Sequence, residues 1–219
     1  MTASRSNAAA GSLLSPTIQL IDDDQAVRES LALLIGTVGL RVMTWADPQA
    51  FLAHFDRDGI GAIVLDVRMP GISGLTVLGT LVAQGVDQPV IMLTGHGTVD
   101  MCRRAFKAGA AEFLEKPVDD ELLIETLQNA VRQHVRSRER HQADREARER
   151  YAQLSERERE VLGFIVAGLT NKEIGRALDL SPRTVETHRA NLFAKLQAES
   201  LAQLIRRYAA LVDAEGATP

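Results

Sequence analysis

The stretch IQLIDDDQAVRES, residues 18–30, joins a short, mostly apolar run to three aspartates and then to a segment with helical spacing. An apolar run that leads directly into a helix-forming segment is typical of a strand followed by a helix. Because adjacent carboxylates repel one another, three aspartates at a strand end indicate a site that gathers positive charge. The strand followed by a helix predicts the fold, and the three aspartates between the two elements predict the site.

The first half of the chain repeats this strand-to-helix step five times. The predicted strands cover 17–22, 41–45, 61–66, 89–94 and 111–115, and the predicted helices cover 25–38, 48–55, 73–84, 98–109 and 119–131. Strands that alternate with helices predict a parallel sheet with helices on both faces. The runs AIVL and VIML are apolar throughout, as expected of strands that are buried on both faces. The predicted fold class of this half is therefore α/β, with a doubly wound parallel sheet.

Charge divides the chain into two unlike halves. The formal net charge of −4 is the sum of −8 over 17–131, +3 over 132–151, +2 over 152–212 and −1 from the two ends of the chain. An acidic half joined to a mildly basic half predicts two domains with different partners. The only cysteine is Cys102, which excludes an internal disulfide and fits a reducing compartment.

The two ends of the chain are predicted to be flexible tails, over 1–16 and 213–219. The first tail lacks the apolar core of a signal peptide, and the chain has no apolar run close to the roughly 20 residues of a membrane span. We therefore expect a soluble, cytoplasmic protein that does not bind membranes.

Polar residues meet at the predicted carboxyl edge of the sheet, where doubly wound folds place their functional groups. The strand ends supply Asp22, Asp23, Asp66, Thr94 and Lys116. Clustered carboxylates need a cation, and oxygen ligands favour Mg²⁺. Asp66 can then act as a nucleophile that forms an aspartyl phosphate, with Lys116 and Thr94 contacting the phosphate. The plainer alternative is an acidic cluster that only caps helices.

Residues 17–131 resemble a response-regulator receiver domain of the flavodoxin-like (βα)5 fold, through their acid pair, acceptor aspartate, threonine and Lys-Pro step. The resemblance implies that Mg²⁺ is bound by Asp23 and Asp66 directly, by Asp22 through water and by the backbone carbonyl of Arg68. It also implies a switch formed by Thr94 and Phe113. Asp24 lies outside this pattern and is expected to cap the first helix.

The second half is purely helical. Residues 132–151 favour a solvated helical linker that continues the preceding helix, because apolar residues are scarce and oppositely charged residues recur three or four apart. Capping signals predict helices from about 156, 171 and 182, and a fourth from about 200. The second and third of these are separated only by a three-residue DLS step, which is helix-turn-helix spacing.

The domain predicted at 152–212 resembles the four-helix LuxR-type DNA-binding domain. In the helix from about 182, Val185, Leu192 and Leu196 form an apolar stripe, while small and polar residues on the opposite face suit the DNA major groove. The residues expected to contact bases or phosphates are Lys172, Arg183, Thr184, Glu186, Thr187, His188, Arg189, Ala190, Asn191 and Lys195. The alternative is a charged helix face that is only solvated.

Together, the two halves resemble the FixJ subfamily of two-component response regulators. The resemblance implies phosphorylation of Asp66 by a cognate histidine kinase with Mg²⁺, dimerisation of the receiver, and binding of double-stranded DNA to regulate transcription, with RNA polymerase as a further partner. Such a protein is not an enzyme. A phosphorylation-independent DNA-binding regulator remains the main alternative. A Mg²⁺-dependent hydrolase is disfavoured because Val67 and Met69 offer no general acid, and an adaptor is disfavoured by the recognition helix.

Overall fold

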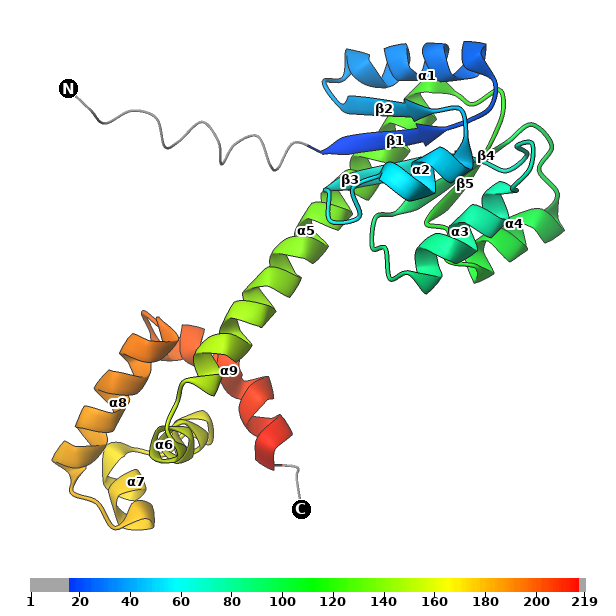
Figure 1. Cartoon of the computed structure of the whole chain (residues 1–219). Helices are drawn as coiled ribbons and strands as arrows, with labels where there is room; N and C mark the ends of the chain where they lie inside the picture. The colour runs from blue at the N-terminus through cyan, green and yellow to red at the C-terminus, as the bar shows by residue number, and fades with distance from the viewer. Residues whose placement is uncertain (1–15, 217–219) are drawn as a thin grey trace, which may run out of the picture. The chain divides into compact units, whose positions relative to one another are not determined.

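The computed structural model describes residues 16–216, so the tail predicted at the N-terminus lies almost wholly outside the described residues. The chain divides into two compact units, 1–138 and 139–219. Helix α5 (Asp120–Ala152) contributes residues to both units (Figure 1).

The first unit contains a five-stranded, fully parallel sheet (Figure 1). Its strands lie in the order β2-β1-β3-β4-β5, which confirms the predicted doubly wound fold. The strand bounds are Thr17–Ile21 for β1, Arg41–Trp45 for β2, Gly61–Asp66 for β3, Val90–Thr94 for β4 and Glu112–Glu115 for β5. The central strand β3 is buried along its whole length.

Helices cover both faces of this sheet because alternate residues of each strand point to opposite sides. On one face, Ile63 and Leu65 of β3 pack with helices α2, α3 and α4. On the other, Ala62 and Val64 pack with helices α1 and α5. The helices before α5 are α1 (Gln25–Thr37), α2 (Pro48–His54), α3 (Gly74–Ala83) and α4 (Val99–Lys107). The uniformly apolar runs therefore reflect two cores, one on each face.

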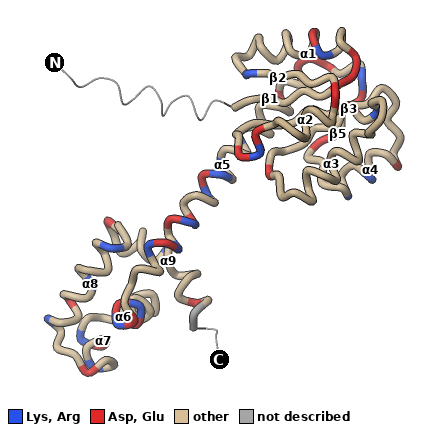
Figure 2. The backbone as a smooth tube through the Cα atoms, viewed as in Figure 1, with Lys and Arg blue, Asp and Glu red and all other residues tan. Residues whose placement is uncertain are grey.

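Helix α5 is continuous across both the last predicted helix of the sheet domain and the predicted linker. Acidic and basic residues are interspersed along its exposed middle (Figure 2). The expectation that 132–151 is simply a solvated linker is wrong at both ends. His134 is buried in the first unit, and Ala147 and Tyr151 are buried in the core of the second.

The second unit adds four helices within the described residues: α6 (Glu156–Val166), α7 (Asn171–Leu178), α8 (Pro182–Leu196) and α9 (Leu201–Gly216). Their starts agree with the capping signals, since Ser155, Thr170 and Ser181 each accept a backbone hydrogen bond as N-caps. Leu204 and Tyr208 of α9 are buried in the core of this unit, whereas Leu201 is exposed.

Two further expectations concern the C-terminal tail and the absence of a membrane span. Helix α9 extends to Gly216, so the predicted C-terminal tail from 213 is helical for its first residues. Within residues 16–216, no helix has the length and apolar character needed to cross a membrane.

Candidate functional site

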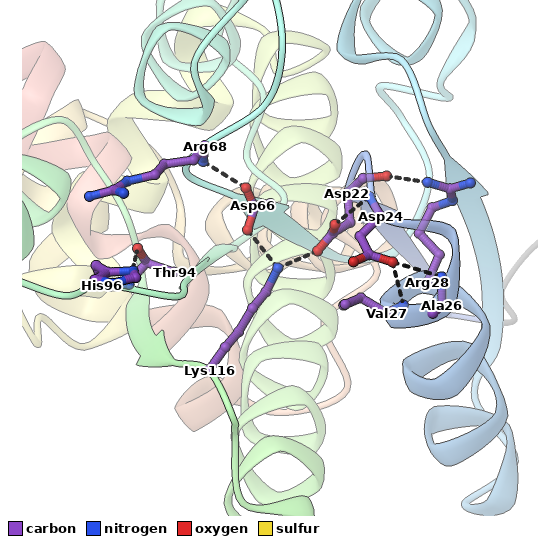
Figure 3. A network of polar contacts seen from close by, with 10 residues as sticks. All are labelled: Asp22, Asp24, Ala26, Val27, Arg28, Asp66, Arg68, Thr94, His96 and Lys116. Carbon is purple, nitrogen blue, oxygen red and sulfur yellow. Dashed lines mark hydrogen bonds and ion pairs between the residues drawn. The ribbon is translucent and has the colours of Figure 1, made fainter.

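Two acidic side chains and one lysine meet at the carboxyl edge of the sheet (Figure 3). The ammonium Nζ of Lys116 lies 2.5 Å from Asp22 Oδ2 and 2.6 Å from Asp66 Oδ1. Asp22 follows β1, Asp66 ends β3, and Lys116 follows β5. Three segments that are distant in the sequence therefore converge on one point, as the strand-end pattern predicts.

Burial and charge oppose one another in this cluster. Asp22 and Asp66 are buried, being 1% and 6% exposed. Burial raises the pKa of Asp66 above its ordinary value, although Lys116 and the backbone N–H of Arg68 act in the opposite direction. Burial alone lowers the pKa of Lys116, but the hydrogen bonds to Asp22 and Asp66 outweigh it, so the pKa is raised. Lys116 therefore remains charged and serves as the counter-ion of the two carboxylates.

The backbone around the cluster explains its local sequence. Asp24 is the N-cap of α1, and its carboxylate accepts hydrogen bonds from Ala26 N and Val27 N, as expected. The guanidinium of Arg28 donates to the backbone oxygen of Asp22 at 2.7 Å and ties α1 to the same turn (Figure 3). At the start of α3, a Cβ on Gly74 would lie 2.1 Å from the backbone oxygen of Asp66, so only glycine fits there.

The remaining residues predicted for this pocket are Asp23, Arg68 and Thr94. Asp23 is exposed next to Asp22. Arg68 contacts Asp66 through its backbone N–H, whose nitrogen lies 2.6 Å from Oδ2. The role predicted for Arg68 belongs instead to its backbone carbonyl, which is expected to bind the metal. Thr94 is buried, and its hydroxyl accepts from His96 N at 3.3 Å (Figure 3).

The loop after β4 packs on the second predicted switch residue, Phe113, which is half-buried. A Cβ on Gly97 would lie 3.3 Å from Phe113 Cε1 and 3.5 Å from Thr94 Cγ2. The Gly97 N–H donates to the carboxylate of Glu115 at 3.0 Å, a contact that sequence reasoning missed. The structure thus places Thr94 and Phe113 against the same loop.

The donor set suits a hard divalent cation. Three carboxylates and one ammonium group, from Asp22, Asp23, Asp66 and Lys116, carry a net charge of −2 when all are ionised, and oxygen ligands favour Mg²⁺. Among the described residues, no three acidic, histidine or cysteine side chains are arranged as a metal site, and Lys116 lies between two of the expected ligands. The residues present thus fit Mg²⁺ by their chemistry and charge, but their side chains, paired with Lys116, are not arranged around a common metal position.

Helix α8 of the second unit carries most of the residues predicted to contact DNA. Its apolar stripe, Val185, Leu192 and Leu196, is completely buried, as expected. Outside this stripe the predicted contact residues Arg183, Glu186, Thr187, Ala190, Asn191 and Lys195 are exposed, while Thr184, His188 and Arg189 are half-buried. Lys172 is exposed on α7. One exposed polar face therefore remains on a helix whose other face is held by the core.

Lys195 also has a structural contact that the sequence reading did not include. Its ammonium Nζ lies 2.7 Å from Glu158 Oε2, and Glu158 is buried on α6. The same carboxylate accepts from the Ser155 backbone N and hydroxyl, completing a capping box. The capping box was visible in the sequence, but the lysine partner, 37 residues away, was not.

The parallel sheet with its acidic edge and the helix-turn-helix unit define a two-component response regulator. Residues 18–128 match the model of the response regulator receiver domain, and residues 152–208 match that of the bacterial regulatory proteins of the luxR family. The chain belongs to the response regulators that combine a receiver domain with a luxR-family DNA-binding domain. These are transcription regulators rather than enzymes. The receiver implies a histidine kinase as partner, and the helix-turn-helix implies DNA binding.

Curated relatives cover nearly the whole chain. The transcriptional regulatory protein FixJ of Azorhizobium caulinodans is 46% identical, over 92% of this chain and 97% of that protein. FixJ of Rhizobium meliloti is 43% identical, over 87% of this chain and 93% of that protein. The response regulator TodT of Pseudomonas putida is 38% identical, over 86% and 83%. The predicted similarity to FixJ is thereby confirmed.

Solved structures of two full-length regulators are similar as well. The response regulator StyR matches with a TM-score of 0.79 and 35% identity, over 90% of this chain and 99% of that one. Full-length FixJ from B. japonicum matches with a TM-score of 0.57 and 41% identity, over 90% and 97%. Both similarities extend across the receiver and the helix-turn-helix unit.

Proposed function

We propose that this response regulator is phosphorylated on Asp66, with Mg²⁺ bound beside it, and that phosphorylation promotes receiver dimerisation and DNA binding through α8. The observation that carries the proposal is the convergence of Asp22, Asp66 and Lys116 at the carboxyl edge of the sheet. A partner histidine kinase supplies the phosphoryl group, and RNA polymerase is the further partner of the DNA-bound regulator.

Asp66 is proposed as the acceptor because it ends the central strand and its carboxylate already contacts a lysine. In the transfer, an Asp66 oxygen forms a bond to phosphorus, and the phosphorus–nitrogen bond to the kinase histidine breaks. Lys116 and the Arg68 N–H hold the acceptor carboxylate in place. Mg²⁺, proposed to be bound by Asp23, Asp66, the Arg68 carbonyl and, through water, Asp22, offsets the charge of the phosphoryl oxygens.

Phosphorylation then changes the loop that contacts the switch residues. A phosphoryl group on Asp66 offers acceptors that draw the Thr94 hydroxyl away from His96. The loop after β4, which contacts both Thr94 and Phe113 through Gly97, then changes its position. The adjacent α4 exposes Val99 and Phe106, seven residues apart on one helix face, and α5 exposes Leu122. These apolar side chains support receiver pairing between α4 and α5 surfaces of two copies.

Removal of divalent metal tests the magnesium proposal directly. We expect EDTA to abolish incorporation of phosphate from acetyl phosphate, and added Mg²⁺ to restore it, because unscreened carboxylates repel the phosphoryl oxygens.

Asp23→Asn should raise the Mg²⁺ concentration needed for half-maximal incorporation by about tenfold or more, since it removes one charged oxygen ligand. Glu29→Gln, an exposed acid on α1, is the matched control and should leave this concentration unchanged. Full incorporation in EDTA would count against the proposal.

The DNA-binding face of α8 is tested on duplexes selected from a random pool by the phosphorylated protein. We expect Arg183→Ala to weaken binding to the selected duplex by about tenfold to a hundredfold, because its exposed guanidinium lies near the start of α8. If Arg183 contacts a base, sequence preference relaxes; if it contacts a phosphate, the slope of log affinity against log salt decreases by about one unit. Arg206→Ala on α9 is the control, and fluorescence anisotropy is the measurement. An unchanged affinity would contradict this assignment.

A further inference from the structure

A buried histidine lies at the end of the receiver opposite to the phosphorylation pocket. His134 of α5 has a side chain that is 1% exposed, and its Nδ1 is 3.0 Å from the oxygen and 3.2 Å from the nitrogen of Gly61. Its Nε2 lies 3.3 Å from Asp87 Oδ1 and 3.3 Å from Arg138 Nε. The proposed mechanism of phosphorylation uses none of these groups.

The histidine ring supplies a hydrogen-bond partner for β3 where a neighbouring strand is missing. Its Nδ1 accepts from the Gly61 N–H or, when it carries the proton, donates to the Gly61 oxygen. Gly61 opens β3 and pairs with Thr17 on the β1 side, but the pairing of β3 with β4 begins only at Ile63. The edge of Gly61 that faces β4 is therefore free for a side chain, and His134 reaches it from α5. A buried backbone polar group without a partner costs free energy, so this contact has a structural reason.

Arg138 extends the same contact to two loops. Its guanidinium Nη2 lies 2.8 Å from Asp87 Oδ1 and 3.3 Å from the backbone oxygen of Arg57. An ionised Asp87 only accepts and Arg138 only donates, so the proton on His134 Nε2 decides which of the two it bonds. In either form the ring joins α5 to β3 and to its polar neighbours. His134, Asp87 and Arg138 are called the polar clasp below.

We propose that the polar clasp extends the receiver's hold on α5 from Val131, the last apolar α5 side chain buried in the receiver core, to Arg138, and that this attachment carries the receiver's switch into α5. The inference rests on the proposed function. Beyond Arg138, the buried α5 side chains Ala147 and Tyr151 belong to the core of the DNA-binding unit. Helix α5 is thus shared, and any change in its attachment to the receiver acts on a helix that continues into the DNA-binding unit.

Two variants of the full-length protein loosen the clasp while sparing the pocket. Arg138→Met keeps the aliphatic part of a side chain that is 29% exposed, and Asp87→Asn removes the charge that pairs with it. Arg136→Met is the matched control, because Arg136 is an exposed arginine on the same helix. His134→Gln is a further variant, since its amide can replace the contact of Nε2 with Asp87 but cannot also replace the contact of Nδ1 with Gly61.

The first measurement is amide hydrogen exchange without phosphorylation. We expect exchange over residues 131–138 and at Gly61 to be about tenfold faster in the clasp variants than in the wild type or the control. Unchanged exchange in all three clasp variants overturns the proposal, because the clasp then does not hold α5.

The second measurement is the ratio of DNA affinities with and without acetyl phosphate. Phosphate incorporation should stay within about twofold of wild type, while the affinity ratio falls to about a third or less. Faster exchange with an unchanged affinity ratio overturns the transmission role. A wild-type ratio of one overturns the proposed function instead, and the exchange data still decide whether the clasp holds α5.

Discussion

Asp66→Asn is expected to abolish incorporation of phosphate from acetyl phosphate and to remove the phosphorylation-dependent increase in DNA affinity. The neutral amide cannot form the acyl phosphate, although its size and its position at the end of β3 are kept. Incorporation is measured with radiolabelled acetyl phosphate and affinity by fluorescence anisotropy on a selected duplex. A variant that still incorporates phosphate would place the acceptor elsewhere.

The matched control for this variant is Asp24→Asn. Asp24 belongs to the same acidic stretch but caps α1, and asparagine is an equally good N-cap, so phosphorylation should be unchanged. If both variants bind DNA like the untreated wild type and acetyl phosphate never changes the wild-type affinity, the chain is a phosphorylation-independent regulator.

Thermal unfolding shows whether Asp66→Asn leaves the receiver folded. The pKa of Asp66 is raised by burial, so its proton is bound more tightly in the folded state. A raised carboxyl pKa lowers stability as the pH rises from the unfolded pKa through the folded pKa. At neutral pH the charged side chain therefore destabilises the receiver, and the asparagine variant should unfold at the same or a higher temperature.

Glu158→Ala is expected to lower the free energy of unfolding of the DNA-binding unit by about 1–2 kcal/mol, because the backbone N–H and the hydroxyl of Ser155 lose their charged acceptor. Lys195 also loses its ion pair, but its side chain is 41% exposed, so water replaces part of that interaction. Differential scanning calorimetry of the full chain resolves the loss as a lower transition temperature of this unit. A change no larger than that of the control below would contradict the assignment.

Glu173→Ala is the matched control, since Glu173 has the same capping-box position at Thr170 but is exposed. We expect a clearly smaller loss of stability from it. The comparison separates the burial and lysine pairing of Glu158 from capping alone.

The same interaction predicts a pH dependence. Burial raises the pKa of Glu158, but hydrogen bonds from Lys195 and Ser155 outweigh it and hold the pKa below its ordinary value of 4.5. A lowered carboxyl pKa stabilises the fold above the unfolded pKa, and this stability is lost as the pH falls through the folded pKa. Wild type should therefore lose stability below about pH 4.5, and Glu158→Ala should lack this part of the loss.

The fold of both units was predictable because their local signals and their packing agree. Uniformly apolar β3 and β4 required burial on both faces, and the caps at Ser155, Thr170 and Ser181 marked the helix starts. The convergence of Asp22, Asp66 and Lys116 was predictable as well, since the carboxyl ends of parallel strands share one edge.

Other features were decided only by the tertiary structure. The pairing of Glu158 with Lys195, the contact of His134 with Gly61, and the loop contact of Glu115 with Gly97 each join residues that are 18 or more positions apart. Burial within the linker expected at 132–151 was not predictable from the sequence either. His134 is buried in the first unit, and Ala147 and Tyr151 are buried in the core of the second.

The sequence by itself determined the element order, the helix caps and the strand-end chemistry of this response regulator, because each depends on neighbouring residues and on their period. Only the tertiary structure decided which polar side chains are buried and which distant partner each one meets. Burial and pairing depend on three-dimensional packing. The local sequence around a charged residue such as Glu158 or Lys116 is the same whether packing leaves that residue in solvent or encloses it.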